Sequence, residues 1–364
     1  IIEMSLDVRD NKAYRDPDAF NEYAKAQIAD AEMHYFLLDE VQLMDDFESV
    51  LIGLMQRRNV DVYVTGSNAR FLSRDVITEF SGRGDEIHMG PLSFGEFMTV
   101  YPGDRRDGFD EYVLYGGLPP VVLIQEEVEK IAFLNRLFAE TYIRDIIQRH
   151  KIRNQSEMEE LLNILSSNIG GLTNPEKLKN TFRTVKKSKI TAATIAKYLS
   201  YLENSYLIES AQRYDIKGKS YIETPLKFYF TDLGLRNARI NFRQVEITHS
   251  MENIIYNELR MRQFNVDVGV VTVSERGKSG VPVRKQLEVD FVCNQGSKRY
   301  YVQSAYALPD EEKRQQELRP FRKIKDSFKK IVITGDTPRP LYNDEGILMM
   351  NIYDFLLNPD SLDI

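Results

Sequence analysis

The stretch HYFLLDEVQLMDDFE, residues 34–48, decides how this sequence is interpreted. The apolar and aromatic residues up to Leu38 predict a buried β-strand. Two adjacent carboxylates, Asp39 and Glu40, follow it directly, and a helix-like run comes next. Two explanations are open at this point. Asp39 can cap the following helix, or the pair can hold a metal ion and orient a water molecule against a phosphate.

Strands and helices alternate on both sides of this stretch. IIEMSL (1–6) and VDVYVTG (60–66) are further strand-like runs. A helix is predicted from Pro17, with Asp16 as its N-cap, because proline is favoured at the first helical position. Near-continuous apolar strands separated by helices are typical of a parallel sheet that is covered on both faces.

The first predicted domain, residues 1–150, ends in a less regular region. A short strand is expected in GDEIHMG (84–90), followed by a break at Pro91. Helices are expected around 109–150, with an interruption at YGGLPP (115–120), where paired glycines and prolines favour a turn.

The character of the sequence changes at about residue 151. Helices with one apolar face are predicted in 157–170 and 191–208, and a helix that begins at an Asn-Pro pair is predicted in 174–189. Two strand-like runs joined around IKGK (216–219) follow, and the glycine there suits a hairpin turn. Three helices followed by a hairpin predict a winged helix-turn-helix domain, residues 151–240.

The last block, residues 241–364, predicts a compact domain with a mixed sheet. Its first helix is MENIIYNELRMRQ, and a basic helix lies within 310–328. The strand-like runs of this block are 266–273, 286–294, 299–307 and 329–335.

Length and composition restrict the class of protein. A chain of 364 residues predicts two or three domains. The net charge of −7 means that any contact with nucleic acid must come from a local basic face. The single cysteine, Cys293, excludes an intramolecular disulfide, and no apolar run approaches a membrane span, so a cytoplasmic protein without a membrane partner is expected. Because the sequence opens on a strand-like run, we expect further residues upstream of Ile1.

The carboxylate pair and the residues after the next strand suit phosphoryl transfer, which needs a held Mg²⁺, an oriented water and a polar sensor of the γ-phosphate. Asp39 would hold the Mg²⁺ and Glu40 would polarise the attacking water. TGSNAR places cofactor-binding candidates beside them at the carboxyl edge of the sheet, where ligands bind in α/β folds. These candidates are Thr65, Ser67 and Asn68, with Asn68 as the best sensor, and Arg83 of SGRG would offset charge on the transferred phosphoryl group.

Nine motifs together resemble one family, the prokaryotic AAA-type ATPases whose C-terminal domain of unknown function is similar to restriction endonucleases. The motifs run through the whole chain and are YFLLDEVQ, VYVTGSNARFLS, SGRG, PLSFGEF, YGGLP, ETYIRDII, YDIKGK, EVDFV and YVQSAYALP. The resemblance implies ATP and Mg²⁺ as cofactors and a P-loop NTPase-type parallel sheet in the first domain.

One element of that family is absent from this sequence. The resemblance implies a glycine-rich phosphate loop, G-x-x-x-x-G-K-S/T, on a central strand before IIEMSL, and no such sequence occurs in the 364 residues. We therefore expect this central phosphate-loop strand to lie in upstream sequence. If the protein begins at Ile1, nucleotide hydrolysis is not expected.

The predicted winged helix carries a local excess of basic residues. Lysine and arginine attract a phosphate backbone without reading its sequence. The alternative is a solvated helical face that binds nothing. The candidate nucleic-acid contacts are Lys179, Arg183, Lys186, Lys187, Lys189 and Lys197.

The last block has residues in the order of a restriction-type nuclease core. Such cores hold Mg²⁺ with two carboxylates and use a lysine two residues beyond the second one. In this sequence Gln303 stands at the position of the second carboxylate and Ala305 at that of the lysine. Glu252 and Asp290 remain as the candidate metal ligands. A degenerate core that serves as a binding platform is the better interpretation.

The sequence thus predicts an ATP-binding and ATP-hydrolysing AAA-type protein that engages DNA through its winged-helix and nuclease-like domains. The alternative is a scaffold or regulator that binds DNA or protein without chemistry, and an active Mg²⁺-dependent nuclease is less favoured. If Arg83 acts on a neighbour's nucleotide, the working form is a homo-oligomer.

Overall fold

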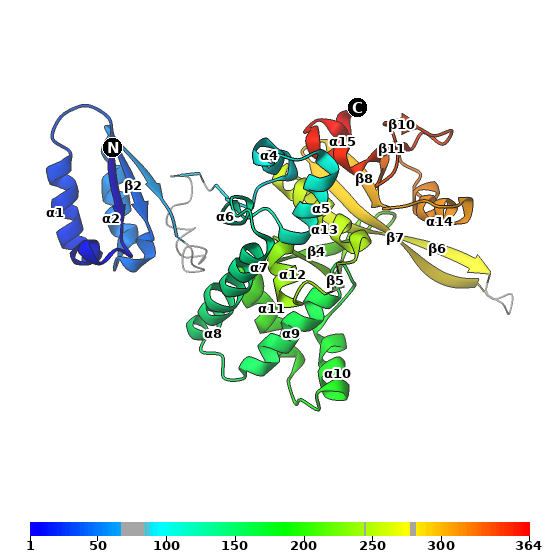
Figure 1. Ribbon diagram of the computed structural model, residues 1–364, viewed down its shortest axis with the longest axis horizontal. Coiled ribbons are helices and arrows are strands. Elements are labelled where there is room, and N and C mark those ends of the chain that lie inside the picture. The colour runs from blue at the N-terminus through cyan, green and yellow to red at the C-terminus, as the bar shows by residue number, and fades with distance from the viewer. Residues whose placement is uncertain (67–83, 86, 244, 277–281) are drawn as a thin grey trace. The chain divides into compact units, whose positions relative to one another are not determined.

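The computed structural model describes residues 1–66, 84–85, 87–243, 245–276 and 282–364. The chain forms two compact units, Ile1–His88 and Met89–Ile364 (Figure 1). The three domain ranges expected from the sequence do not coincide with these two units, because residues on both sides of 150 and of 240 belong to the second one.

The first unit contains the parallel sheet that the sequence predicts. Its strands are β1 (Ile2–Ser5), β2 (His34–Asp39) and β3 (Val60–Val64), in the order β1-β2-β3, and both pairings are parallel. The connecting elements are η1 (Arg9–Arg15), α1 (Pro17–Gln27), η2 (Val41–Leu43) and α2 (Phe47–Met55).

The helices of this unit pack against the sheet through their apolar residues. Phe20 of α1 and Leu51 of α2 are buried in one cluster with Phe36 and Leu38 of β2. Helix α1 begins as predicted, since the Asp16 side chain accepts a hydrogen bond of 2.9 Å from the backbone N–H of Ala19. Burying each large apolar side chain contributes about 2 kcal/mol to stability. The shared cluster therefore holds the helices on the sheet.

The short strand expected in 84–90 is absent from the described residues of that stretch. The first regular element afterwards is α4 (Phe94–Val100), which begins at a capping box between Ser93 and Glu96. Two glycines and Pro91 within eight residues weaken strand propensity, because glycine loses backbone entropy and proline cannot donate to a ladder.

The second unit is rich in helices before its sheet begins. Helix α9 is followed by α10 and α11, as predicted for the middle block, and α10 contacts α11. The helices and helical turns up to this point are α5 (Arg105–Tyr115), α6 (Pro119–Val122), α7 (Glu127–Arg136), η3 (Leu137–Ile143), α8 (Arg144–Arg149), α9 (Gln155–Ser167), α10 (Pro175–Val185) and α11 (Ala192–Asn204).

The strands of the second unit form one mixed sheet in the order β10-β11-β9-β8-β7-β6-β4-β5. Their bounds are β4 (Ile208–Asp215), β5 (Ser220–Phe230), β6 (Asn265–Arg276), β7 (Pro282–Gln295), β8 (Lys298–Ser304), β9 (Lys329–Thr334), β10 (Leu341–Tyr342) and β11 (Leu348–Asn351). The remaining elements are α12 (Leu233–Arg239), α13 (Ile247–Met261), α14 (Glu311–Arg322), α15 (Ile352–Leu357) and η4 (Ser361–Asp363).

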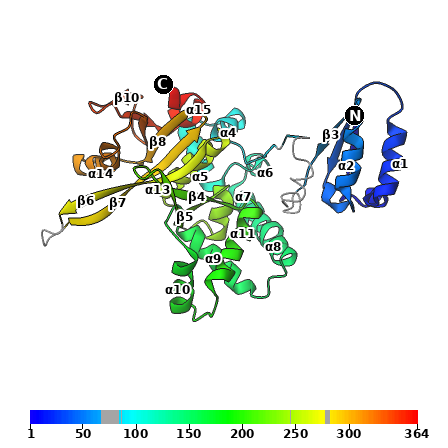
Figure 2. The same cartoon turned by 180° about the vertical axis from the view of Figure 1, so that it is seen from behind.

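The predicted hairpin of β4 and β5 is present, but it is not a free wing. The two strands pair antiparallel, and β4 also pairs parallel with β6, with Arg213 opposite Val268. The hairpin is therefore continuous with the sheet of the last block. In both views one end of the β6–β7 pair extends beyond the neighbouring strands (Figures 1 and 2).

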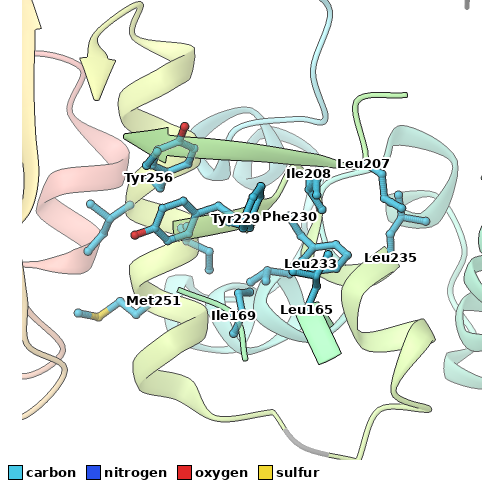
Figure 3. Packing of buried hydrophobic residues seen from close by; sticks show 14 of the residues in the cluster. Leu165, Ile169, Leu207, Ile208, Tyr229, Phe230, Leu233, Leu235, Met251 and Tyr256 are labelled. Carbon is cyan, nitrogen blue, oxygen red and sulfur yellow. The ribbon is translucent and has the colours of Figure 1, made fainter. Parts of the chain in front are cut away.

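Most helices of this unit share a core with its sheet (Figure 3), and α14 packs in a second buried cluster. Tyr229 of β5 stacks on Tyr256 of α13, with ring centroids 4.2 Å apart. Asn253 of α13 joins the same two elements, since its side chain accepts from the Phe230 N–H at 2.8 Å and donates to the Phe230 carbonyl at 2.7 Å. Apolar packing and these buried polar contacts together set the position of α13 on β5.

A buried carboxylate joins the YGGLPP turn to the start of α12. Asp232 accepts from the backbone N–H of Gly117 at 2.8 Å and from that of Leu235 at 3.0 Å. The turn is tight, since Gly116 has φ of +76°, and a Cβ on Gly234 would lie 2.0 Å from the carbonyl oxygen of Tyr115. Burial raises the pKa of Asp232 to about 6, against the opposing effect of the backbone N–H groups.

Candidate functional site

The three parallel strands of the first unit place polar side chains at one edge of the sheet. Ser5 ends β1, Asp39 ends β2 and lies opposite Ser5 in register, and Thr65 follows β3. The Ser5 hydroxyl lies 2.7 Å from Oδ2 of Asp39, and the Thr65 hydroxyl donates to Oδ1 of the same carboxylate. The carboxyl ends of parallel strands meet at one edge, which is why residues 34 and 26 positions away from Asp39 in sequence reach its side chain.

Hydrogen bonds stabilise the charged form of Asp39. The bonds from Thr65 and then Ser5 lower the pKa of Asp39, with a smaller contribution from the backbone N–H of Glu40. The carboxylate is therefore ionised at neutral pH. It does not cap a helix, because no side-chain cap is present at the start of η2 or of α2, so the structure does not support the capping explanation.

Glu40 has an unusual backbone conformation for a residue with a side chain. Its φ of 54° and ψ of 41° lie in the left-handed region, which costs about 1 kcal/mol or more outside glycine. The side-chain amide of the buried Gln42 donates to the Glu40 carboxylate, and the Glu40 N–H points to the Thr65 hydroxyl at 3.4 Å. Gln42 was not among the sequence candidates, although its spacing of two residues from Glu40 was visible.

The structure thus brings together Asp39, Glu40 and Thr65, the candidates that it describes in the first unit. Ser67, Asn68 and Arg83 lie outside the described residues, and their roles stay predictions.

The basic candidates of the second unit lie on two adjacent helices and their connection. Five of them are exposed: Arg183 on α10, Lys186, Lys187 and Lys189 after it, and Lys197 on α11. Two of the basic residues form ion pairs, since Lys179 lies 2.5 Å from Glu176 and Lys186 lies 3.2 Å from Glu160. Both pairs are partly exposed and contribute little free energy.

The predicted metal ligands of the last block do lie close together, but around a lysine. Nζ of Lys227 on β5 lies 2.8 Å from Oε1 of Glu252 on α13 and 3.9 Å from Oδ1 of Asp290 on β7. It also lies 2.8 Å from Oε1 of Glu288. No local pattern points to Lys227, because it lies 25 residues from Glu252 in the chain and within the predicted winged-helix block.

Burial and neighbouring charges shift the pKa values of Lys227 and Asp290. Burial opposes the charge on Lys227, but the carboxylates of Glu252, Asp290 and Glu288 outweigh that effect and raise its pKa overall. Burial and the neighbouring Glu252 raise the pKa of Asp290, against the opposing effects of Lys227 and the Ser304 N–H. Gln303 is also used structurally, since it accepts from the Asp290 N–H at 3.3 Å and donates to Glu317 at 3.0 Å.

Other features of the described chain add no further site. No group of three or more His, Cys, Asp or Glu side chains there could hold a metal ion. Cys293 is buried, and burial raises its pKa. Within the same residues, no helix combines the length and the apolar character that crossing a membrane requires.

Two family models match parts of this chain. The model of an AAA domain matches residues 1–98, and the model of a domain of unknown function (DUF8612) matches residues 106–246. The first unit therefore contains an AAA domain, as the motifs had implied. Neither match tests the winged-helix or restriction endonuclease-like assignments, which stay predictions.

Two relatives extend the similarity over most of the chain. A Haemophilus influenzae protein described as uncharacterized is 34% identical over 331 residues, which are 90% of this chain and 78% of that protein. The chain belongs to the same family as this Haemophilus protein. The uncharacterized protein MJ1544 of Methanocaldococcus jannaschii is 27% identical over 93% of this chain and 75% of its own length.

Solved structures show only distant similarity. The crystal structure of protein VC1899 from Vibrio cholerae aligns with 95% of this chain and 77% of its own, at 12% identity and a TM-score of 0.22. The Aeropyrum pernix ORC1 protein in complex with DNA aligns with 66% of this chain and 77% of its own, at 11% identity and a TM-score of 0.23. Scores this low carry no argument about fold or function.

Proposed function

We propose that the AAA domain of this protein binds and hydrolyses ATP, with Mg²⁺ as its metal ion. The observation that carries the proposal is the convergence of Ser5, Asp39 and Thr65 at the carboxyl edge of a parallel sheet, with Glu40 next to them. An ionised carboxylate with neighbouring hydroxyl and amide groups fits Mg²⁺, which prefers oxygen ligands and keeps several of its waters.

Each described residue has a distinct role in this proposal. Asp39 would hold the Mg²⁺, which when bound would neutralise charge on the phosphates. Glu40 would accept a proton from the attacking water, and Gln42 would orient its carboxylate. The Thr65 hydroxyl donates to Asp39 and favours its ionised form, and Thr65 is also proposed as a nucleotide contact. Ser67 and Asn68 are proposed as further nucleotide contacts, with Arg83 as the residue that offsets phosphoryl charge.

The glycine-rich phosphate loop is not part of this sequence. The 364 residues contain no G-x-x-x-x-G-K-S/T motif, so the proposal requires residues beyond them to grip the phosphates. ATP binding is therefore best tested on the full-length product of the gene.

The test compares Glu40→Gln with the wild-type full-length protein. We expect Glu40→Gln to bind a fluorescent ATP analogue as tightly as wild type but to hydrolyse ATP about 100-fold or more slowly, because only the proton acceptor is lost. The matched control is Glu3→Gln, an exposed glutamate on β1 of the same sheet, which should leave both properties unchanged.

Two results would count against this proposal. Full turnover by Glu40→Gln would remove the role of Glu40. If the wild-type full-length protein binds no nucleotide, the alternative gains, namely a scaffold or regulator that binds DNA or protein without chemistry.

We further propose that DNA is a partner and that the exposed basic residues of α10, α11 and their connection contact its backbone. Support comes from their clustering in a chain whose net charge is −7. These contacts would be independent of base sequence, since lysine and arginine on phosphates position a duplex without specifying it.

A further inference from the structure

Three elements supply the charged groups of the cluster around Lys227. Its own strand β5 brings the ammonium group, α13 brings Glu252, and β7 brings Glu288 and Asp290. Residues two apart on a strand share one face, which is why Glu288 and Asp290 both reach the centre from β7. We call these four residues the Lys227 centre.

The Lys227 centre is enclosed by protein. The side chains of Lys227, Glu252 and Asp290 are 5%, 11% and 10% exposed, and only Glu288, at 34%, is partly open to solvent. The backbone at Gly170 covers Glu252 closely, since a Cβ there would lie 3.1 Å from Oε1 of that carboxylate.

Several carboxylate oxygens of the centre already have partners. Oε1 of Glu252 accepts from Lys227 at 2.8 Å and from the Tyr229 hydroxyl at 2.7 Å. Oδ2 of Asp290 accepts from the Ser304 N–H at 2.8 Å. A divalent ion placed here would have to displace the ammonium group, because two positive charges within a few ångströms repel strongly at low dielectric.

We propose that the ammonium group of Lys227 is the resident cation of this centre, so that the carboxylates cannot take up a divalent metal ion while the lysine is present. The centre then joins β5, α13 and β7 by charge, as a metal ion would. Its domain acts by binding its partner and not by metal-dependent cleavage of a phosphodiester. This inference concerns the second unit and does not depend on the proposed ATP site.

The test measures Mn²⁺ binding by electron paramagnetic resonance, using the full chain with Asp39→Asn so that the nucleotide site does not contribute. We expect this parent and its Asp290→Asn derivative to give identical titrations. Lys227→Ala added to the parent should increase Mn²⁺ affinity at least about tenfold, and Asp290→Asn added to that variant should abolish the gain.

Two outcomes would overturn the inference. One is Mn²⁺ binding by the parent that disappears with Asp290→Asn while Lys227 is intact. The other is a folded Lys227→Ala variant that binds no more Mn²⁺ than the parent. If Lys227→Ala does not fold, the double variant Lys227→Gln with Glu288→Gln takes its place in the test, because it keeps the net charge of the centre. The comparison of the parent with Asp290→Asn needs no Lys227 variant.

Discussion

Asp232 makes the stability of the second unit depend on pH in a direction opposite to that of most paired carboxylates. Its folded pKa of about 6 lies above the ordinary value of 3.8, so the folded protein binds the proton more tightly than the unfolded chain does. The contribution of this proton to the free energy of unfolding is present in full below pH 3.8 and is lost as the pH rises through 6. One pKa unit corresponds to about 1.4 kcal/mol, so the whole change amounts to about 3 kcal/mol.

The perturbation is Asp232→Asn, which keeps the shape of the side chain and removes its titration. Urea unfolding of wild type and variant is followed at several pH values between 4 and 7, by hydrogen exchange of peptides from α12 and from the YGGLPP turn. Other buried carboxylates titrate in both proteins, so the difference between the two unfolding free energies isolates Asp232. Relative to the variant, the unfolding free energy of wild type should fall by about 2 kcal/mol between pH 4 and pH 7.

If the unfolding free energies of wild type and Asp232→Asn differ by the same amount at every pH from 4 to 7, Asp232 does not have a raised pKa in the folded protein. The same conclusion holds if the difference grows in favour of wild type as the pH rises, since that is the behaviour of a carboxylate with a lowered pKa.

Two other substitutions test the packing and the basic face. Gly234→Ala should destabilise the second unit by about 3 kcal/mol in urea unfolding, because its Cβ would meet the Tyr115 carbonyl. The control is Gly53→Ala, where the new Cβ meets nothing within 4 Å, and it should be neutral or stabilising in the same assay. Lys186→Ala with Lys187→Ala should weaken binding of duplex DNA in fluorescence anisotropy and reduce the slope of log affinity against log salt by up to about 2; an unchanged slope would argue against backbone contacts by these two residues.

The arrangement of the first unit could be predicted largely from local patterns. Apolar runs of strand length and the Asp16-Pro17 helix start are signals within a few residues, because propensity and capping act locally. Their parallel pairing then requires Asp39 and Thr65 to lie at the same edge. The short strand expected in 84–90 is absent from the residues described there, because its glycines and the following Pro91 oppose the strand that its apolar residues favour.

Local patterns in the sequence were thus enough to predict the three parallel strands of the first unit and the place of the carboxylate pair at their edge. They did not predict that β4 and β5 join the sheet of the last block, or that Lys227 lies between Glu252, Glu288 and Asp290. Sheet order and the partners of a buried charge depend on contacts between residues far apart in the chain, and no local periodicity encodes them.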